Sequence, residues 1–240
     1  MLINFTHQPA YILHTRAYRD TSLLLEVYTE ELGRIVAIAR GVKRSKRPLT
    51  GLLQPFIPLS FSAKGRGDIV TMTAVEQRGM PLQLSGQRQV AGLYINELMV
   101  RLLERSESAP MLFVTYQNTL LNLQEQSIEI SLRYFERRLI ETLGYGVSFD
   151  ITLADAQPII ESEYYTFIDN QGFIPATIQH SKVSTIFPGN ILLKISREEY
   201  SCAESLLAAK KLFRQVLQKY LGRKPLMSRQ LWLNCAQESR

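Results

Sequence analysis

The stretch SLLLEVYTEELGRIVAIA at residues 22–39 predicts a β-hairpin. Residues 22–28 and 34–39 are rich in apolar and β-branched side chains, and Gly33 closes the turn between them, where glycine accepts the positive φ that tight turns need. Three more runs of this kind occur before residue 80, with turn residues between them. They cover residues 11–14, 58–63 and 68–75. Five short strands at this spacing predict a small barrel.

After Met80-Pro81 the spacing of apolar residues becomes that of amphipathic helices. The predicted elements are helices at residues 87–104, 110–123 and 127–143, a β-hairpin at 164–175, a helix from a capping box of Ser196 and Glu199 to residue 222, and a short helix containing Trp232 with Ser228 as its cap. These elements predict an α+β fold. A barrel domain covers residues 1–80, and an all-helical domain covers residues 81–240, with a small irregular hairpin near 160–176.

The composition indicates a folded globular protein. The chain has 240 residues, of which 45% are hydrophobic and 21% charged, so two domains are expected. The sequence has no apolar run long enough to cross a membrane and no signal sequence in its first ten residues, so we expect a cytoplasmic protein. Its two cysteines, Cys202 and Cys235, are far apart and have no histidine cluster near them, so neither a disulfide framework nor a zinc site is indicated.

Positive charge is concentrated in the barrel segment. The thirty-six residues 32–67 contain no acidic residue and eight basic ones, more than the net charge of +6 of the whole chain. Such a field attracts a polyanion, and a phosphate backbone is the natural partner. With a basic loop between its third and fourth strands, the barrel resembles an oligonucleotide-binding (OB) fold. The alternative is that this run of charges only solvates a loop.

A second basic segment follows an acidic one. Residues 205–237 carry seven basic residues and no acidic one, whereas residues 100–204 carry eight basic and fourteen acidic residues. The second segment either binds nucleic acid or neutralises the acidic middle of the chain. The candidate DNA-binding residues from both segments are Arg34, Arg40, Lys43, Arg44, Lys46, Arg47, Lys64, Arg66, Lys210, Lys211, Arg214, Lys219, Arg223 and Lys224.

Aromatic residues flank the basic loop. Tyr18 and Tyr28 precede it, and Phe56 and Phe61 follow it. Small cores use aromatic side chains heavily, so we expect each of these residues in the core rather than on a surface that stacks bases.

No residue pattern indicates catalysis. His7, His14 and His180 are isolated from nucleophiles and carboxylates. Residues 41–51 lack the Gly-Lys-Ser/Thr ending of a phosphate-binding P-loop. The acidic residues of the middle segment show no metal-ligand spacing. We therefore expect no enzyme activity, no cofactor and no bound metal.

Eight motifs together resemble the RecO family of bacterial recombination mediators. They are LHTR at residues 13–16, DTSLLL at 20–25, TEELGR at 29–34, ARGVKR at 39–44, LTGLLQPF at 49–56, GLYINEL at 92–98, LGYG at 143–146 and LGRKPLMSR at 221–229. The resemblance implies an OB-fold barrel, a helical domain and a place at the nucleoid in the RecF pathway of DNA repair. It also implies binding of single- and double-stranded DNA, annealing of complementary strands, association with RecR, and help to RecA in displacing the single-stranded DNA-binding protein SSB.

The chain departs from many family members in one respect. Those members carry a four-cysteine zinc site after the third helix, but residues 145–176 contain no cysteine here. The resemblance therefore places the chain in a zinc-free branch, in which ordinary packing must hold the hairpin.

The resemblance further implies a contact with the acidic, phenylalanine-ended tail of SSB. Such a tail needs an apolar pocket with a cation at its rim. We place this pocket on Tyr116, Leu120, Leu132 and Arg133; the alternative is that these residues are interhelical core. Two other functions stay open: an RNA-binding factor with the same barrel, and a scaffold whose basic ends bind acidic protein segments.

Overall fold

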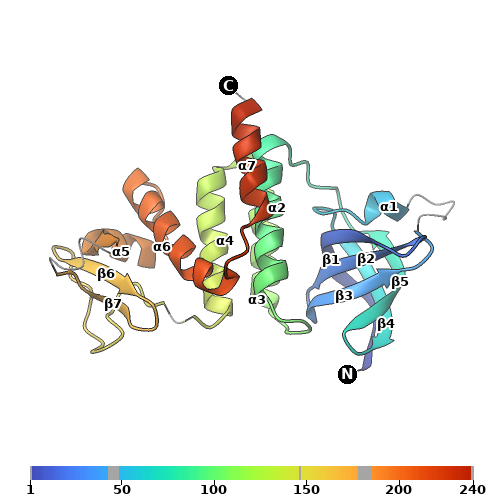
Figure 1. The fold of residues 1–240 in the computed structure, drawn as a ribbon, viewed down its shortest axis with the longest axis horizontal. Coiled ribbons are helices and arrows are strands. Elements are labelled where there is room, and N and C mark those ends of the chain that lie inside the picture. Colours follow the sequence, from blue (N-terminus) through green and yellow to red (C-terminus); the bar gives the residue numbers. More distant parts are fainter. Residues whose placement is uncertain (1, 43–48, 146, 178–184, 239–240) are drawn as a thin grey trace. The chain divides into compact units, whose positions relative to one another are not determined.

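The computed structural model of the chain describes residues 2–42, 49–145, 147–177 and 185–238 (Figure 1). The chain forms two compact units. The first contains Met1–Ile128 and Arg223–Arg240, and the second contains Glu129–Gly222. The second unit is therefore an insertion into the first.

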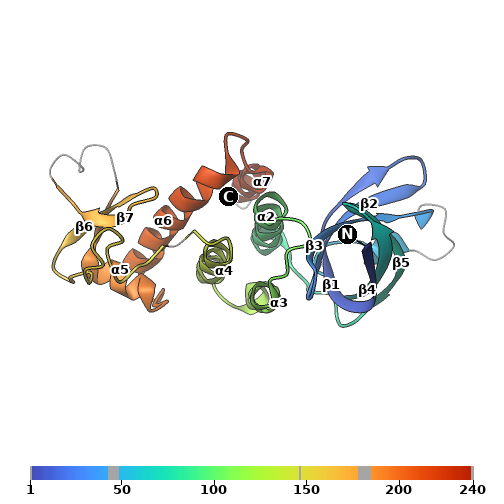
Figure 2. The same cartoon turned by 90° about the horizontal axis from the view of Figure 1, so that it is seen from below.

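The first unit is built on a closed five-stranded barrel. Its strands are β1 (Leu2–Tyr18), β2 (Ser22–Thr29), β3 (Gly33–Ala39), β4 (Leu59–Arg66) and β5 (Ile69–Gln77), in the order β1-β2-β3-β5-β4. Strands β3 and β5 are parallel, and the other neighbours are antiparallel. Figure 2 shows the strands closing into a ring. The predicted fold class, an OB-like barrel followed by helices, is confirmed.

Strand β1 is longer than the four residues that the sequence predicts. Its first half pairs with β4 and its second half with β2, and the register shifts between Phe5 and Gln8 and again between Ile12 and His14. Two such irregularities let one strand bend across the barrel and close it without a free edge. A short helix, α1 (Leu49–Leu52), lies between β3 and β4 and was not predicted.

Apolar side chains fill the barrel. Ile12, Leu25, Val27, Ile35 and Phe61 are all at most 2% exposed and belong to one buried cluster. Phe61 therefore lies in the core, as expected.

Helices α2 (Gly86–Leu102) and α3 (Pro110–Glu125) belong to the same compact unit as the barrel. Asn96 on α2 donates from Nδ2 to the carbonyl oxygen of Leu13 at 3.0 Å and accepts from the hydroxyl of Tyr116 at 2.8 Å. Tyr11 and Tyr28 of the barrel pack against Phe113 and Tyr116 of α3. The compact units are therefore not the two segments that a division at residue 80 would produce.

Helix α7 (Met227–Glu238) completes the first unit and packs along α2 (Figures 1 and 2). Arg101 on α2 donates to the carbonyl oxygens of Lys224, at 2.8 Å, and Pro225, at 3.3 Å, just before α7 begins. The helix starts one residue before Ser228, so Ser228 lies inside it rather than capping it. A carboxylate of α2, Glu97, caps it instead.

The second unit combines helices α4 (Ile128–Thr142), α5 (Gly189–Ser196) and α6 (Ala203–Leu221) with a sheet in the order β7-β6-β8. Its strands are β6 (Tyr164–Ile168), β7 (Gly172–Pro175) and β8 (Ile186–Pro188). The predicted hairpin is confirmed as β6 and β7. Phe173 packs against Phe149, Phe167 and Phe187, so an aromatic core holds the hairpin.

The predicted capping box of Ser196 and Glu199 is wrong. Ser196 is the last residue of α5, and its carbonyl oxygen accepts a hydrogen bond from Arg137 at 3.0 Å. Helix α6 starts later, with Cys202 as its N-cap, and the Cys202 thiol accepts from the backbone N–H of Ser205 at 3.3 Å. Hydrogen bonds with the side chain and backbone of Ser205 lower the pKa of the Cys202 thiol.

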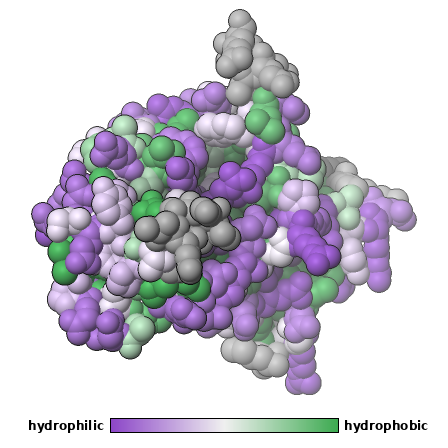
Figure 3. Space-filling view, turned by 60° about the vertical axis from the view of Figure 1, so that its left-hand side comes forward, coloured by the Kyte–Doolittle hydropathy of each residue, from purple (hydrophilic) through white to green (hydrophobic). Residues whose placement is uncertain are grey.

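The face in Figure 3 is largely hydrophilic, and its apolar residues form small separate patches. Among the described residues, the helices are too short or too polar to cross a membrane.

Candidate nucleic-acid interface

The candidate residues of the barrel divide into three groups. Arg40, Lys64 and Arg66 are exposed. Lys43, Arg44, Lys46 and Arg47 lie outside the described residues. The third group is Arg34 alone, which is buried.

Arg34 is held by the protein itself. Its Nε and Nη2 donate to the carbonyl oxygen of Leu103 at 3.0 and 2.7 Å, and its Nη1 forms an ion pair with Glu26 at 2.9 Å. Its own carbonyl oxygen accepts from the backbone N–H of Ser106 at 2.8 Å. These bonds join β3 to the segment after α2, so we leave Arg34 out of the candidate interface.

Arg40 lines an open pocket of about 530 Å³ at one end of the barrel. The pocket is formed by the turn between β1 and β2 and by the end of β3. Its lining residues are Tyr18, Arg19, Asp20, Thr21, Ser22, Ile38, Arg40 and Gly41. In OB folds, the loop between the first two strands and the face of strands 2 and 3 bind oligonucleotides. The pocket therefore occupies the position at which this fold takes its ligands.

The sequence analysis did not identify Arg19 as a candidate residue, and it placed Tyr18 in the core. Arg19 precedes the acid-free run of residues 32–67, and the neighbouring Asp20 cancels its charge in a local count. Its guanidinium lies 5.4 Å from the centre of the Tyr18 ring. Tyr18 is half-buried, whereas Tyr28 is fully buried in the core, so only the second of these tyrosines lies where we expected it.

Lys64 and Arg66 do not line this pocket. They lie on β4 opposite Asn4 and Leu2 of β1, and both side chains are exposed. The structure thus brings Arg19 and Arg40 together and leaves Lys64 and Arg66 elsewhere on the barrel.

Only some of the basic residues of α6 are free of partners within the described residues and could contact nucleic acid. Lys210 forms an ion pair with Glu129 at 2.7 Å, and Lys219 donates to Asn170 at 2.6 Å. Lys211 and Arg214 are exposed and have no ion pair within the described part of the chain. Lys210 therefore neutralises an acidic residue of the protein itself, as the alternative reading of this segment predicts. Lys211 and Arg214 remain candidates for binding DNA.

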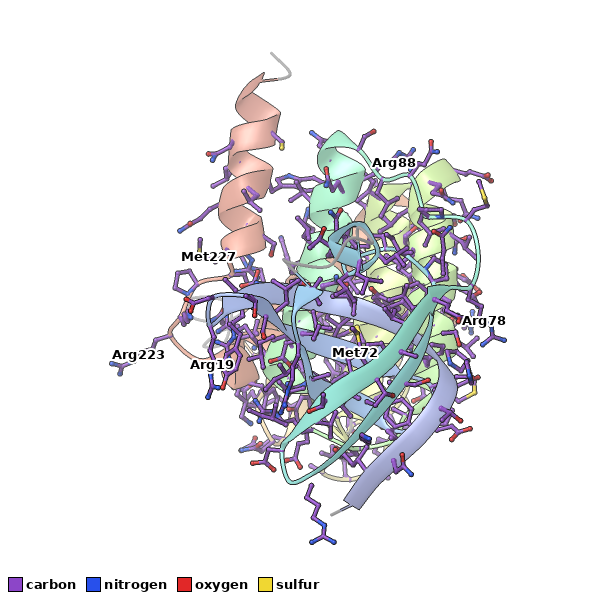
Figure 4. The ribbon with its side chains drawn as sticks, turned by 90° about the vertical axis from the view of Figure 1, so that its right-hand side faces the viewer. Arg19, Met72, Arg78, Arg88, Arg223 and Met227 are labelled. Carbon is purple, nitrogen blue, oxygen red and sulfur yellow. The ribbon has the colours of Figure 1, made fainter. Side chains whose placement is uncertain are left out.

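Arg223 and Lys224 belong to the first unit, not to the unit that contains α6. Both are exposed, and Figure 4 shows Arg223 projecting from the same side of the view as Arg19. The basic segment of residues 205–237 is therefore divided between the two units.

The four residues on which we placed the SSB tail are interior residues. Tyr116 and Leu120 are fully buried in the first unit. On α4, Leu132 is buried, and Arg133 is buried in an ion pair with Glu136 at 2.9 Å. A bound tail needs accessible side chains, so we leave these four residues out of the candidate interface.

A different hollow in the first unit has the chemistry that such a tail requires. It is an open pocket of about 620 Å³ between the barrel and α3. Its apolar lining includes Pro58, Leu82, Phe113 and Leu121, and exposed Arg78 and half-buried Glu30 also line it. Figure 4 shows Arg78 and Arg19 on opposite sides of the barrel, so the two pockets are separate.

Comparisons with known proteins agree with the fold. The family models described as recombination protein O N terminal and recombination protein O C terminal match residues 1–80 and 83–230. A DNA repair protein RecO from Actinobacillus pleuropneumoniae serotype 3 is 39% identical over 226 residues, which is 93% of each chain. Proteins of the same name from Pasteurella multocida and Coxiella burnetii strain RSA 493 are 39% and 38% identical, over 94% and 93% of this chain and 93% and 96% of theirs. The chain therefore belongs to the RecO family of DNA repair proteins.

Proposed function

We propose that this chain is a recombination mediator. It binds single- and double-stranded DNA, anneals complementary strands and, with RecR, helps RecA to load onto single-stranded DNA coated with SSB. Membership of the RecO family supports a role in DNA repair, and the charge distribution supports the DNA-binding part of the proposal.

The observation that carries the proposal is the basic pocket at the ligand-binding position of the barrel. Arg19 and Arg40 line it, and in the sequence Arg40 is followed closely by four further cations at residues 43–47. Contacts from arginine and lysine to phosphate give affinity that depends steeply on salt and little on base sequence. A mediator that acts on any damaged sequence needs this kind of binding.

Exposed cations outside the barrel pocket support annealing. Lys211 and Arg214 on α6 belong to the second unit, Arg223 and Lys224 before α7 belong to the first, and none of the four is among the lining residues of the pocket. Annealing requires two polyanions to approach each other, and two basic surfaces can neutralise one strand each while leaving the bases free to pair. The reaction forms and breaks no covalent bond, so we propose no catalytic residue.

The proposed contact with SSB uses the hollow between the barrel and α3. Its apolar lining would take the terminal phenylalanine of the tail, and Arg78 would pair with a tail carboxylate. Glu30 also lines the hollow and would repel acidic residues, so we expect the carboxylates of the tail to pair with Arg78 and to avoid Glu30.

The test is the rate at which the protein anneals complementary oligonucleotides precoated with SSB, measured across a salt series. A variant carrying Arg44→Glu and Arg47→Glu should anneal at least about ten-fold more slowly, because each reversed charge removes a phosphate contact and adds a repulsion. The matched control carries Arg105→Glu and Arg197→Glu, two exposed arginines outside the proposed surfaces, with the same change in net charge.

The control should anneal within about two-fold of the unmodified protein, because a distant charge is screened at physiological salt. Equal loss in both variants would show that only the net charge matters and would contradict the proposed interface. DNA binding without annealing would favour the scaffold, and preference for RNA would favour the RNA-binding factor.

A further inference from the structure

We propose that the pocket lined by Arg19 and Arg40 holds one unstacked nucleotide of a single DNA strand. The phosphate would lie between the two guanidinium groups, and the base would stack on the ring of Tyr18. This inference deepens the proposed DNA binding and rests on it, because it assigns one surface of the barrel to single-stranded DNA.

Strand pairing builds the pocket from distant parts of the sequence. Tyr18 on β1 pairs with Ser22 on β2, and Leu23 pairs with Ala39 on β3. The turn that carries Arg19 therefore lies beside the residues that follow β3, and Arg40 reaches the same pocket. Arg19 and Arg40 therefore line one pocket although 21 positions separate them in the sequence.

The charge of the lining fits one phosphate. Arg19 and Arg40 are both exposed, and neither has an ion-pair partner among the described residues. Asp20 is the acidic residue of the lining, so the lining residues sum to a single positive charge. One phosphodiester carries one negative charge, so a single nucleotide neutralises the pocket.

The size of the pocket favours an unpaired nucleotide. A volume of about 530 Å³ lies within the range of about 300–1,000 Å³ typical of small-ligand sites. A base inside a duplex is paired and stacked, and it enters a protein pocket only after both contacts are broken. A base of a single strand is free to enter, and aromatic rings and guanidinium planes both provide surfaces on which it can stack.

The backbone conformation of Arg19 suits a substitution by glycine. Arg19 lies in the turn between β1 and β2, and its φ of 52° is in the left-handed region, which non-glycine residues seldom adopt. Arg19→Gly is therefore an unusually clean variant. It removes the guanidinium while fitting the backbone conformation better than arginine does.

The test compares a labelled oligo(dT) with a duplex of equal length, by fluorescence anisotropy at one fixed salt concentration. Tyr18→Leu should weaken binding of oligo(dT) about ten-fold, as expected for the loss of one stacked base. Tyr18→Phe keeps the ring and should bind within two-fold of the unmodified protein. Arg19→Gly should weaken oligo(dT) binding at least about five-fold, and duplex binding should change less than two-fold in all three variants.

An abasic strand separates the base contact from the phosphate contact. On a strand of abasic sites, Tyr18→Leu should bind as tightly as the unmodified protein, whereas Arg19→Gly should still bind more weakly. An effect of Tyr18→Leu on the abasic strand equal to that on oligo(dT) would overturn the stacking role.

The outcomes distinguish this inference from the proposed function. If Arg44→Glu with Arg47→Glu weakens DNA binding but Tyr18→Leu and Arg19→Gly do not, the pocket is not a nucleotide site and the DNA-binding proposal stands. If the unmodified protein binds neither oligo(dT) nor duplex, both the nucleotide pocket and the proposed DNA-binding function are contradicted. Tighter binding of oligo(U) than of oligo(dT), lost in Tyr18→Leu, would overturn DNA as the ligand in favour of RNA.

Discussion

The carboxylate of Glu97 on α2 accepts two hydrogen bonds from Ser228 on α7, one from the backbone N–H at 2.9 Å and one from the hydroxyl at 2.7 Å. Its other oxygen accepts from the backbone N–H of Met227 at 2.9 Å. The first N–H groups of a helix have no partner within the helix, and a negative charge beside them is favourable. A residue 130 positions earlier in the chain therefore acts as the N-terminal cap of α7.

Glu97→Gln should loosen α7. The change removes the negative charge and one acceptor, so the free energy of unfolding of the first unit should fall by about 1–2 kcal/mol. The loss should appear in urea denaturation and as faster amide exchange in α7. Glu104→Gln, at an exposed position near the end of α2, is the control and should change stability by less than about 0.5 kcal/mol. Equal amide exchange in both variants would contradict the capping role.

The same contact should make the docking of α7 depend on pH. Burial alone would raise the pKa of Glu97, but the hydrogen bonds from Ser228 and Met227, together with Arg101, lower it below its ordinary value. A lowered pKa in the folded state means that the carboxylate stabilises the fold above the unfolded pKa of about 4.3. This stabilisation is lost as the pH falls through the folded value.

Trp232 reports on this equilibrium, because it is the single tryptophan of the chain and lies on α7. Its fluorescence should change below about pH 4.3 in the unmodified protein. Glu97→Gln should lack this step, since glutamine does not titrate. A step of unchanged size in the variant would assign the transition to another group.

Arg34 should contribute to stability rather than to DNA binding. Arg34→Ala leaves half-buried Glu26 without its cation and removes both bonds from the guanidinium to Leu103, so unfolding should become easier by about 2–3 kcal/mol. Arg40→Ala, at an exposed position, should change stability by less than about 0.5 kcal/mol. Urea denaturation measures both. At a temperature where both variants are folded, Arg34→Ala should keep its DNA affinity and Arg40→Ala should lose part of it.

Two glycines allow the contact between the barrel and the segment after α2 to be tested. Gly33 and Gly41 have φ values of 64° and 68°, so alanine is strained by a similar amount at both, about 1–2 kcal/mol. A Cβ at Gly33 would also clash with the carbonyl oxygen of Glu107, whereas one at Gly41 would meet no atom of the described residues within 4 Å. Gly33→Ala should therefore cost at least about 2 kcal/mol more than Gly41→Ala in urea denaturation. Equal costs would show that the segment at Glu107 can move away.

The hollow between the barrel and α3 should bind a peptide with an acidic segment and a terminal phenylalanine. Arg78→Ala should weaken this binding about ten-fold, as expected for the loss of one charge-assisted hydrogen bond. Arg223→Ala removes an exposed cation elsewhere in the same unit and serves as the control. Isothermal titration calorimetry gives both affinities. A peptide that binds both variants equally well does not use this hollow.

The barrel could be predicted because its strands are short and its turns have recognisable chemistry. Gly33 has positive φ at the turn between β2 and β3, as the sequence predicts. The two irregularities of β1 leave no comparable signal, since a bulge changes the pairing partner and not the residue types. Ser196 was misassigned because serine followed by glutamate three residues later also occurs where a helix ends and a loop begins.

The candidate site was only partly predictable, because charge counting does not show burial. Arg34 belongs to the acid-free run but faces Glu26 and Leu103, and only the tertiary fold reveals these partners. Arg19 is the opposite case, since Asp20 cancels its charge in a count while its side chain lines the pocket. Three of the four residues proposed for the SSB tail, Tyr116, Leu120 and Leu132, are apolar positions of helices, and such positions are most often core. The fourth, Arg133, is buried with Glu136, a partner on the same helix that a charge count does not reveal.

The insertion of the second unit into the first sets an order of events during synthesis. Glu97 and Arg101 leave the ribosome before the whole of Glu129–Gly222, and the segment that they hold, at Lys224 and Ser228, leaves only afterwards. At translation rates of about 5–20 residues per second, this delay lasts roughly 6–25 s. During that time the nascent chain presents the surface of α2 that α7 will later cover, and chaperones and proteases have access to it.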